Sequence, residues 1–244
     1  KYTVVDESML RDMAASHSDM FERLATTFVT SMNQLFSGHN ISFNQDIGNW
    51  DVSNVTSMER MFAGRISFNK NIGKWDVSSV TSMSEMFSGT ESFNQPIGNW
   101  DVSNVTNMNS MFQSAPHFNQ DISKWNTGNV ENMNHMFYGA QCFNQNIENW
   151  NVEKVTDMNG MFWAAYRFNK PLNKWNIKNV KKMVMMFHHA HAFNQDINDW
   201  DVSNVTRMDQ MFFSAKRFNK PLDKWKVHKV ISMSNMFQDA RCFN

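Results

Sequence analysis

Three histidines stand close together in the sequence His188-His189-Ala190-His191 and could bind a transition metal. Imidazole nitrogens are common zinc ligands, but a zinc site usually gathers four ligands at characteristic spacings. No cysteine or carboxylate accompanies the three histidines at such a spacing, and they follow Phe187 in an expected turn. We therefore expect solvated turn residues, with an adventitious metal site as the alternative. No metal and no other cofactor is expected to belong to the protein.

Carboxylates are numerous enough to suggest acid–base catalysis, but most of them recur at one position of a repeat. Such a column contains Asp51, Asp76, Asp101 and Asp201. An active site normally interrupts a repeat with a single convergent cluster of unlike residues. The chain also lacks a glycine-rich phosphate loop and a nucleophile elbow. We therefore expect a protein that is not an enzyme and has no catalytic residues.

The two cysteines, Cys142 and Cys242, occupy the same repeat position four repeats apart. Stacked repeats would separate them by roughly 20 Å at the spacing of β-strands. A disulfide needs Cα atoms within about 7 Å. We expect two free thiols.

Asparagines at Asn54, Asn104 and Asn204 lie in Asn-x-Thr sequences, and Asn40 lies in Asn-Ile-Ser. Such sequences accept N-linked glycans in secreted proteins. The first three share a repeat position, which favours a role in the fold over a role in glycosylation.

All these residues sit in a repeat of 25 residues. Tryptophans mark the period at Trp50, Trp75, Trp100, Trp125, Trp150, Trp175, Trp200 and Trp225. A Phe-Asn pair keeps the same interval from Phe43-Asn44 to Phe243-Asn244, and a Met-x-x-Met-Phe unit follows each tryptophan. Periodicity of this kind is typical of solenoids, in which each repeat buries its apolar face against its neighbours.

The fold class expected is α/β, a leucine-rich-repeat-type solenoid with a short strand and a short helix in each repeat. Its apolar spacing matches such repeats: Ile47-x-x-Trp50-x-Val52-x-x-Val55. Residues 50–52 would form the strand. Residues 58–62 would form the helix, because Met58, Met61 and Phe62 have the i, i+3, i+4 spacing of one helical face. The asparagine of each Phe-Asn pair is expected to form a column that bonds to turn backbone groups.

Residues 1–28 do not follow the repeat and are expected to form an N-terminal helical cap. Apolar residues there have the spacing of one or two amphipathic helices: Met9, Leu10, Met13, Met20, Phe21, Leu24 and Phe28. A cap of this kind covers the exposed core of the first repeat. Residues 29–244 would then form about nine repeats, and we expect further repeats, a cap or a partner to follow Asn244.

The repeat F-N-Q-x-I-x-x-W-D-V-S-N-V-T-x-M-x-x-M-F-x-x-A closely resembles that of BspA-type leucine-rich-repeat surface proteins. Such repeats occur in bacterial surface proteins and mycoplasma lipoproteins, and also in protists and large DNA viruses. The resemblance covers residues 29–244. It implies a non-catalytic module used in adhesion or partner binding, often at a cell surface.

Aromatic residues gather at one variable position, directly after Met-Phe. It is occupied by Ala63, Ser88, Gln113, Tyr138, Trp163, His188, Phe213 and Gln238. Nearby variable positions add rings and positive charges. The candidate partner-binding residues are Tyr138, Trp163, Tyr166, Arg167, His188, His191, Phe213, Lys216 and Arg217.

Aromatic residues and arginine are the favoured anchors of protein interfaces, and flat rings also suit sugar faces. A protein partner is therefore expected first and a glycan second, with local packing of the rings as the plain alternative. The formal net charge of zero argues against nucleic acid, despite the lysines of the C-terminal half. No apolar stretch reaches the length of a membrane span.

Charge is unevenly distributed along the chain. Residues 1–150 contain 8 Lys/Arg and 15 Asp/Glu, whereas residues 151–244 contain 15 and 8. This difference indicates either drift of solvated positions or an arrangement in which opposite ends attract. The function expected is a protein-interaction or adhesion module at a cell or particle surface, either extracellular or particle-associated. The alternative is a structural subunit of a larger assembly such as a virion or envelope layer.

Overall fold

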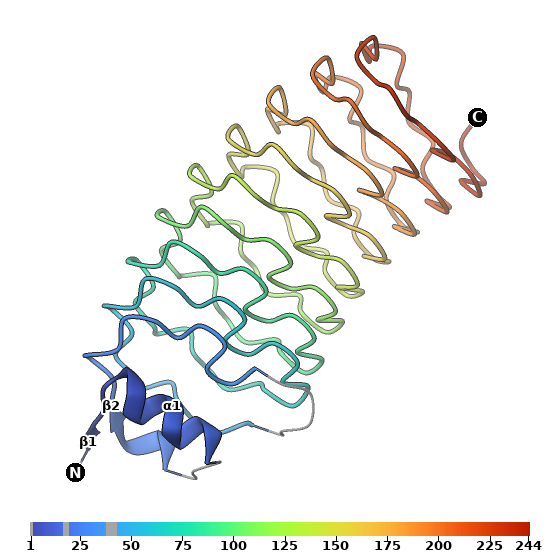
Figure 1. Cartoon of the computed structure of the whole chain (residues 1–244). Coiled ribbons are helices and arrows are strands. Elements are labelled where there is room, and N and C mark those ends of the chain that lie inside the picture. The colour runs from blue at the N-terminus through green and yellow to red at the C-terminus, as the bar shows by residue number, and fades with distance from the viewer. Residues whose placement is uncertain (1, 17–19, 38–42) are drawn as a thin grey trace.

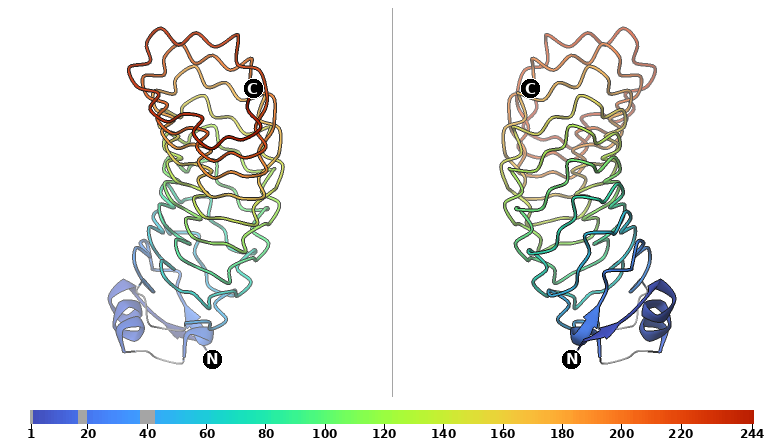
Figure 2. Two further views of the ribbon diagram at one scale, coloured as in Figure 1. Left: turned by 90° about the vertical axis from the view of Figure 1, so that its right-hand side faces the viewer. Right: turned by 90° about the vertical axis from the view of Figure 1, so that its left-hand side faces the viewer.

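The computed structural model describes residues 2–16, 20–37 and 43–244 as a long stack of coils with the two termini at opposite ends (Figure 1). Successive coils lie side by side along the whole stack in both side views (Figure 2). The 25-residue solenoid expected from the sequence is confirmed, because equivalent residues of neighbouring coils are in direct contact throughout.

The first coils are covered by a small N-terminal layer. It contains the strand β1 (Thr3–Val4), the helix α1 (Glu7–Ala15), the 3₁₀ turn η1 (Phe21–Arg23) and the strand β2 (Leu24–Ala25). Asp6 caps α1 by accepting a hydrogen bond from the Met9 backbone N–H, and β1 pairs in parallel with β2.

Within residues 2–16 and 20–28, the helical cap expected from the sequence is therefore one α-helix, a 3₁₀ turn and a pair of two-residue strands. Leu10, Phe21 and Leu24 are buried, as an amphipathic pattern requires. Met9, Met20 and Phe28, which the same pattern placed on the buried face, are 45%, 61% and 70% exposed. The Phe21 carbonyl accepts from the indole of the first column tryptophan, so this layer also joins the hydrogen bonding of the stack. Its division from the solenoid at residue 28 stays a prediction.

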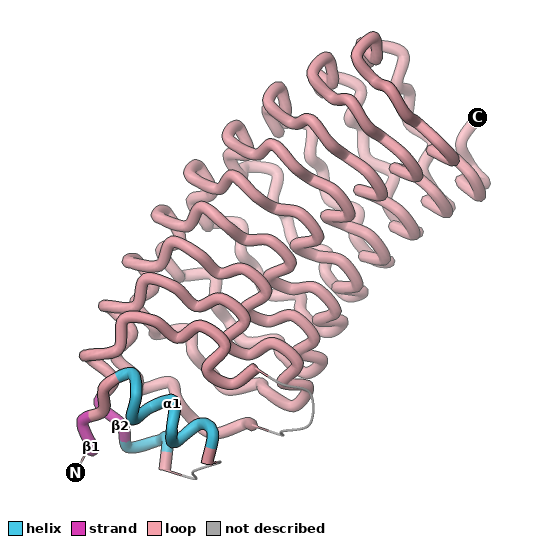
Figure 3. The backbone as a smooth tube through the Cα atoms, viewed as in Figure 1, coloured by secondary structure: helices cyan, strands magenta, loops and turns pink. Residues whose placement is uncertain are grey.

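The coils have almost no regular secondary structure (Figure 3). In residues 43–244 the expected strand at 50–52 and helix at 58–62 are both absent. Single parallel bridges link the coils at another position, in the order Ser31, Ser57, Ser82, Asn107, Asn132, Asp157, Lys182, Arg207 and Ser232. The prediction of a leucine-rich-repeat strand and helix in each repeat was thus wrong for these residues.

Turns replace the helix because the backbone amides bond sideways to the next coil. The N–H groups of Met58, Arg60 and Phe62 donate to carbonyls of residues 82, 84 and 86, at 2.9–3.0 Å. The Met61 N–H donates to the Met58 carbonyl, which closes a turn. Arg60 has φ 54°, a left-handed conformation that interrupts a right-handed helix. A chain of turns still buries residues at i and i+3. The same spacing is typical of a helix, and for this reason it led to a wrong prediction of a helix at 58–62.

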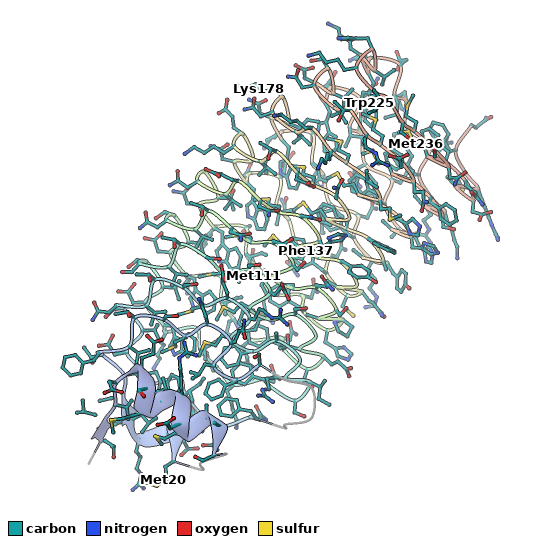
Figure 4. All side chains as sticks on the ribbon, in the orientation of Figure 1. Met20, Met111, Phe137, Lys178, Trp225 and Met236 are labelled. Carbon is teal, nitrogen blue, oxygen red and sulfur yellow. The ribbon has the colours of Figure 1, made fainter. Side chains whose placement is uncertain are left out.

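The core consists of columns of like apolar residues, and columns of aromatic rings are a large part of it. Phe62 lies 5.6 Å from Phe87 of the next coil, centroid to centroid, and Phe68 lies 6.0 Å from Phe93. These rings are stacked and fully buried. Met111 and Phe137 show the same inward placement in the middle of the stack, whereas Lys178 lies at its outer edge (Figure 4). Burial of large apolar side chains between coils is the main stabilising contribution.

Each column tryptophan also satisfies a buried backbone carbonyl of the preceding coil. The indole Nε1 of Trp75 donates to the Ile47 carbonyl at 3.1 Å, and Trp125 repeats this contact with Ile97. The bond recurs for every column tryptophan from Trp50 to Trp225. An indole N–H is a donor that must find a partner when it is buried. Tryptophan therefore fixes the register between coils as well as filling the core.

The expected asparagine column is present. The Oδ1 atom of Asn94 accepts the backbone N–H of Asn119 at 2.9 Å, and the Oδ1 atom of Asn119 accepts that of Asn144. The same contact continues in both directions, from Asn44 to Asn244. Each asparagine thus replaces a backbone acceptor for the coil that follows it.

Candidate functional site

Four aromatic residues predicted from the sequence form a continuous row across four coils. The ring centroids of Tyr138 and Trp163 are 4.6 Å apart, those of Trp163 and His188 are 5.0 Å apart, and those of His188 and Phe213 are 4.7 Å apart. We call these four residues the aromatic row. The rings lie side by side because residues 25 positions apart occupy the same place in successive coils.

The aromatic row is partly packed and partly accessible. His188 is only 8% exposed, whereas Tyr138, Trp163 and Phe213 are half-buried. Packing therefore covers His188 almost completely, and part of each of the other three rings stays accessible. The structure brings the four rings together but does not make them a fully open ridge.

A fifth ring supports the row and was missed by sequence reasoning. His135 lies 5.9 Å from Tyr138 and 6.3 Å from Trp163, centroid to centroid. Its ring fills the space above Gly160, where a Cβ atom would lie 2.3 Å from the His135 Cδ2. Burial lowers the pKa of His135, and the nearby Asp157 opposes this effect. The signal was present in the sequence, since Gly160 and His135 share one repeat position.

A second line of predicted residues runs beside the row. Tyr166 is 38% exposed and stacks on His191 at 4.9 Å with the rings nearly parallel. Arg167, Lys216 and Arg217 are exposed. Burial, and then the positive charge of Lys216 and the neighbouring His189, lower the pKa of His191. Rings and positive charges therefore lie next to each other on the C-terminal coils. We call the surface formed by the aromatic row and this second line of residues, together with the equivalent positions of the other coils, the strip.

The histidines do not form a metal cluster. The Nδ1 atoms of His188 and His189 are 2.7 Å apart, so one nitrogen is the donor and the other the acceptor. Burial lowers the pKa of His188 to about 4, with a further contribution from His189, so its neutral form is favoured. Over residues 2–16, 20–37 and 43–244, no three histidine, cysteine or acidic residues converge as metal ligands would.

On the N-terminal coils the same strip is hollow. Small residues replace the rings at Ala63 and Ser88, and glycine follows each of them. They leave a shallow cavity of about 410 Å³, whose further lining includes Arg60, Glu85, Ile66 and Glu91. Arg60 and Glu85 form an ion pair at 3.6 Å. Sequence reasoning concentrated on the rings and overlooked the empty half of the strip.

The recurring carboxylates have structural partners. The Oδ1 atoms of Asp51, Asp101 and Asp201 each accept the backbone N–H of the serine two residues later. Hydrogen bonds from that serine are the main reason that the pKa of each carboxyl is lowered. These aspartates therefore shape a turn of each coil.

The remaining chemical candidates are also accounted for. Cys142 is a half-buried free thiol, and Cys242 is an exposed one. The amide nitrogens of Asn54, Asn104 and Asn204 donate to backbone carbonyls of the preceding coil. Asn40 lies outside the described residues.

Comparison with known proteins places the repeat in a family. Overlapping stretches of the chain, residues 7–115, 69–170, 93–191 and 171–244, match the family described as "Mycoplasma protein of unknown function, DUF285". The chain belongs to this family. The DUF285 repeat covers both the coils with the aromatic row and those with the hollow, so the two differ within one kind of repeat.

Other comparisons add little. No curated protein matches the chain. One solved structure with some similarity is the "Crystal structure of TLR13-ssRNA13 complex", which is 10% identical with a TM-score of 0.22 over 98% of this chain and 51% of that one. The chain thus spans about half the length of that protein, and a likeness this weak carries no argument. In the described part of the chain, no helix is long and apolar enough for a transmembrane segment.

Proposed function

We propose that this DUF285 chain is a non-catalytic protein-interaction module that binds its partner through the strip of the aromatic row. The observation that carries the proposal is the continuous row from Tyr138 to Phe213 with exposed Arg167, Lys216 and Arg217 beside it. Half-buried rings are held in fixed positions, so a partner binds them with little further loss of side-chain entropy. Arginine and aromatic residues together are typical anchors of protein interfaces.

Further arguments support a binding role over catalysis. The recurrent carboxylates that could serve as acids or bases are already hydrogen-bonded within turns. The repeat also resembles that of BspA-type leucine-rich-repeat proteins, which favours adhesion and display at a cell or particle surface. A glycan is a second ligand class for the rings, since flat aromatic faces suit sugar rings.

A crosslinking pull-down from the native source tests the proposal. The test variant combines Tyr166→Ala, Arg167→Ala, Lys216→Ala and Arg217→Ala, which are exposed positions whose replacement leaves the core intact. The control variant combines Lys181→Ala and Lys226→Ala, exposed positions elsewhere in the coil. We expect the wild type and the control to capture the same protein and the test variant to lose it. Equal capture by all three would show that the strip is not the interface.

The identity of the captured protein separates two cases. A receptor from another cell supports adhesion. A coat or envelope component supports the alternative of a structural subunit in a larger assembly. Loss of capture by the control as well would indicate a general charge effect and would contradict the proposal.

A further inference from the structure

The aromatic row offers ring edges to a ligand more than open ring faces. Trp163, inside the row, has Tyr138 at 4.6 Å in the coil before it and His188 at 5.0 Å in the coil after it, centroid to centroid. In the second line, Tyr166 and His191 cover one face of each other, with an interplanar angle of 12°. A nucleic-acid base stacks on an open ring face, and so does a sugar ring. Rings that cover one another favour neither ligand.

Ring edges suit a different kind of ligand. The edge of an aromatic ring is electrically positive and its face negative. Tyr138, Trp163 and Phe213 are half-buried, so part of each ring can still be covered by a partner. Such rings suit a segment that carries both apolar and negatively charged groups.

Positive charges without an acidic partner stand beside the rings. Four cations are exposed at the two variable positions of the second line: Arg167, Lys216, Arg217 and Arg241. None of the ion pairs in residues 2–16, 20–37 and 43–244 includes any of the four. In the coils from 163 to 242, Asp239 is the one carboxylate at or between the positions of the two lines. The C-terminal half of the strip is therefore cationic.

The spacing of the cations matches an extended peptide that runs along the stack. Arg167 and Arg217 hold the same position two coils apart, about 10 Å at the spacing of bridged strands. Lys216 and Arg241 lie one coil apart, about 5 Å by the same spacing. An extended peptide places alternate side chains about 7 Å apart on one face, so about five residues bring two or three carboxylates to these cations. The planar guanidinium of arginine also binds a carboxylate through two parallel hydrogen bonds.

We infer that the C-terminal half of the strip binds an extended acidic segment of a partner protein, with carboxylates on the cations of the second line and apolar side chains against the aromatic row. This rests on the proposed function, because it names the class of partner for the same surface. Binding breaks no ion pair of the free chain, since the four cations make none within the described residues. Salt screens attraction between exposed charges, so the affinity falls as the ionic strength rises.

Fluorescence anisotropy with labelled peptides tests the acidic class. One probe is an alternating Glu-Ala peptide of about ten residues, long enough in extended form to cover these coils. The other is the neutral Gln-Ala peptide of the same length. We expect the wild type to bind the acidic peptide at least about tenfold more tightly in low salt. Lys216→Gln with Arg217→Gln removes most of this preference, whereas Lys181→Gln with Lys226→Gln keeps it, because those two lysines are exposed elsewhere in the coil.

Three results would overturn the inference. One is equal binding of the two peptides, and another is an equal loss in both variants, which would show general attraction between charges. The third is no binding of the acidic peptide at about 1 mM in low salt, where screening is weakest.

Two competitors test the other anionic ligands. One is a short oligothymidylate and the other is a sulfated heparin-type oligosaccharide. We expect both to displace the acidic peptide only weakly, because neither finds an open ring face. If either binds the strip more tightly than the acidic peptide does, the ligand is a nucleic acid or a glycan, and the acidic segment is wrong.

The two proposals can fail separately. The strip variant can lose a foreign protein that the acidic peptide does not displace from the wild type. That result would keep the proposed function and overturn the acidic class. An acidic peptide bound at Lys216 and Arg217, by a chain that captures no protein, would keep the binding preference and overturn the proposed function.

Discussion

Replacing Asn119 with alanine tests the asparagine column at the middle of the stack. The Oδ1 atom of Asn119 accepts the backbone N–H of Asn144 at 2.9 Å and the Nε2 of Gln145 at 3.0 Å. Alanine removes this oxygen and with it both hydrogen bonds. The Gln145 amide keeps its second bond to the Asn119 carbonyl, so the main loss is the backbone amide of Asn144.

The expected cost follows from that single amide. An unsatisfied buried donor costs about 1–3 kcal/mol, and a half-buried one lies in the lower part of that range. With a smaller contribution from Gln145, we expect Asn119→Ala to lower the free energy of unfolding by about 2 kcal/mol. Asn119→Asp is the matched control, because it keeps an oxygen at the Oδ1 position, and it should cost at least about 1 kcal/mol less.

Urea unfolding followed by tryptophan fluorescence measures the cost, provided that the m-value is unchanged. Solenoids open locally, so hydrogen exchange at the Asn144 amide gives a second, local measurement. We expect faster exchange there in the alanine variant and near-native exchange in the aspartate variant. Equal destabilisation by alanine and aspartate, or unchanged exchange at Asn144, would refute the assignment of this asparagine as a backbone acceptor.

Three further predictions concern single residues. Trp125→Phe leaves the buried Ile97 carbonyl without its donor and should cost about 2–3 kcal/mol in urea unfolding; no change would contradict the role of the indole. Burial lowers the pKa of His188 to about 4, below the unfolded value of about 6.5, so stability present above pH 6.5 is lost as the pH falls toward 4. His188→Phe should flatten that part of the melting-temperature profile. Gly160→Ala places a Cβ against the His135 ring at φ 56° and should cost about 2 kcal/mol by thermal unfolding; a neutral effect would show that the histidine moves away freely.

The sequence predicted which residues are buried better than it predicted the backbone. Trp125, Met111 and Phe137 are buried as the repeat required, because a side chain that recurs at every period has to meet its own copies. The strand and helix were wrong because spacings of two and three residues also occur in successive turns. Only the path of the backbone amides, such as that from Arg60 to the next coil, distinguishes turns from a helix.

The sequence predicted which residues of the candidate site lie in one line, but it did not predict how exposed each of them is. The period placed Tyr138, Trp163 and Phe213 in one line, and the structure agrees. How deeply each ring sits depends on its neighbour in the next coil, as for His188, and composition does not report that depth. The hollow at Ser88 exists because a small side chain stands where other coils have a ring. A search for reactive side chains does not detect such a position.

The indole-to-carbonyl bond affects which insertions and deletions the fold tolerates. Trp150 donates to Ile122, and Trp125 makes the equivalent bond to Ile97, so any coil offers the acceptor that any other coil needs. Removing or duplicating a block of 25 residues would join two coils whose tryptophan and acceptor carbonyl still match, although pairs fitted to each other, such as His135 and Gly160, would be separated. Unequal recombination between such blocks therefore changes the length of the protein in whole coils, and it shifts the acidic and basic halves relative to each other without breaking the core.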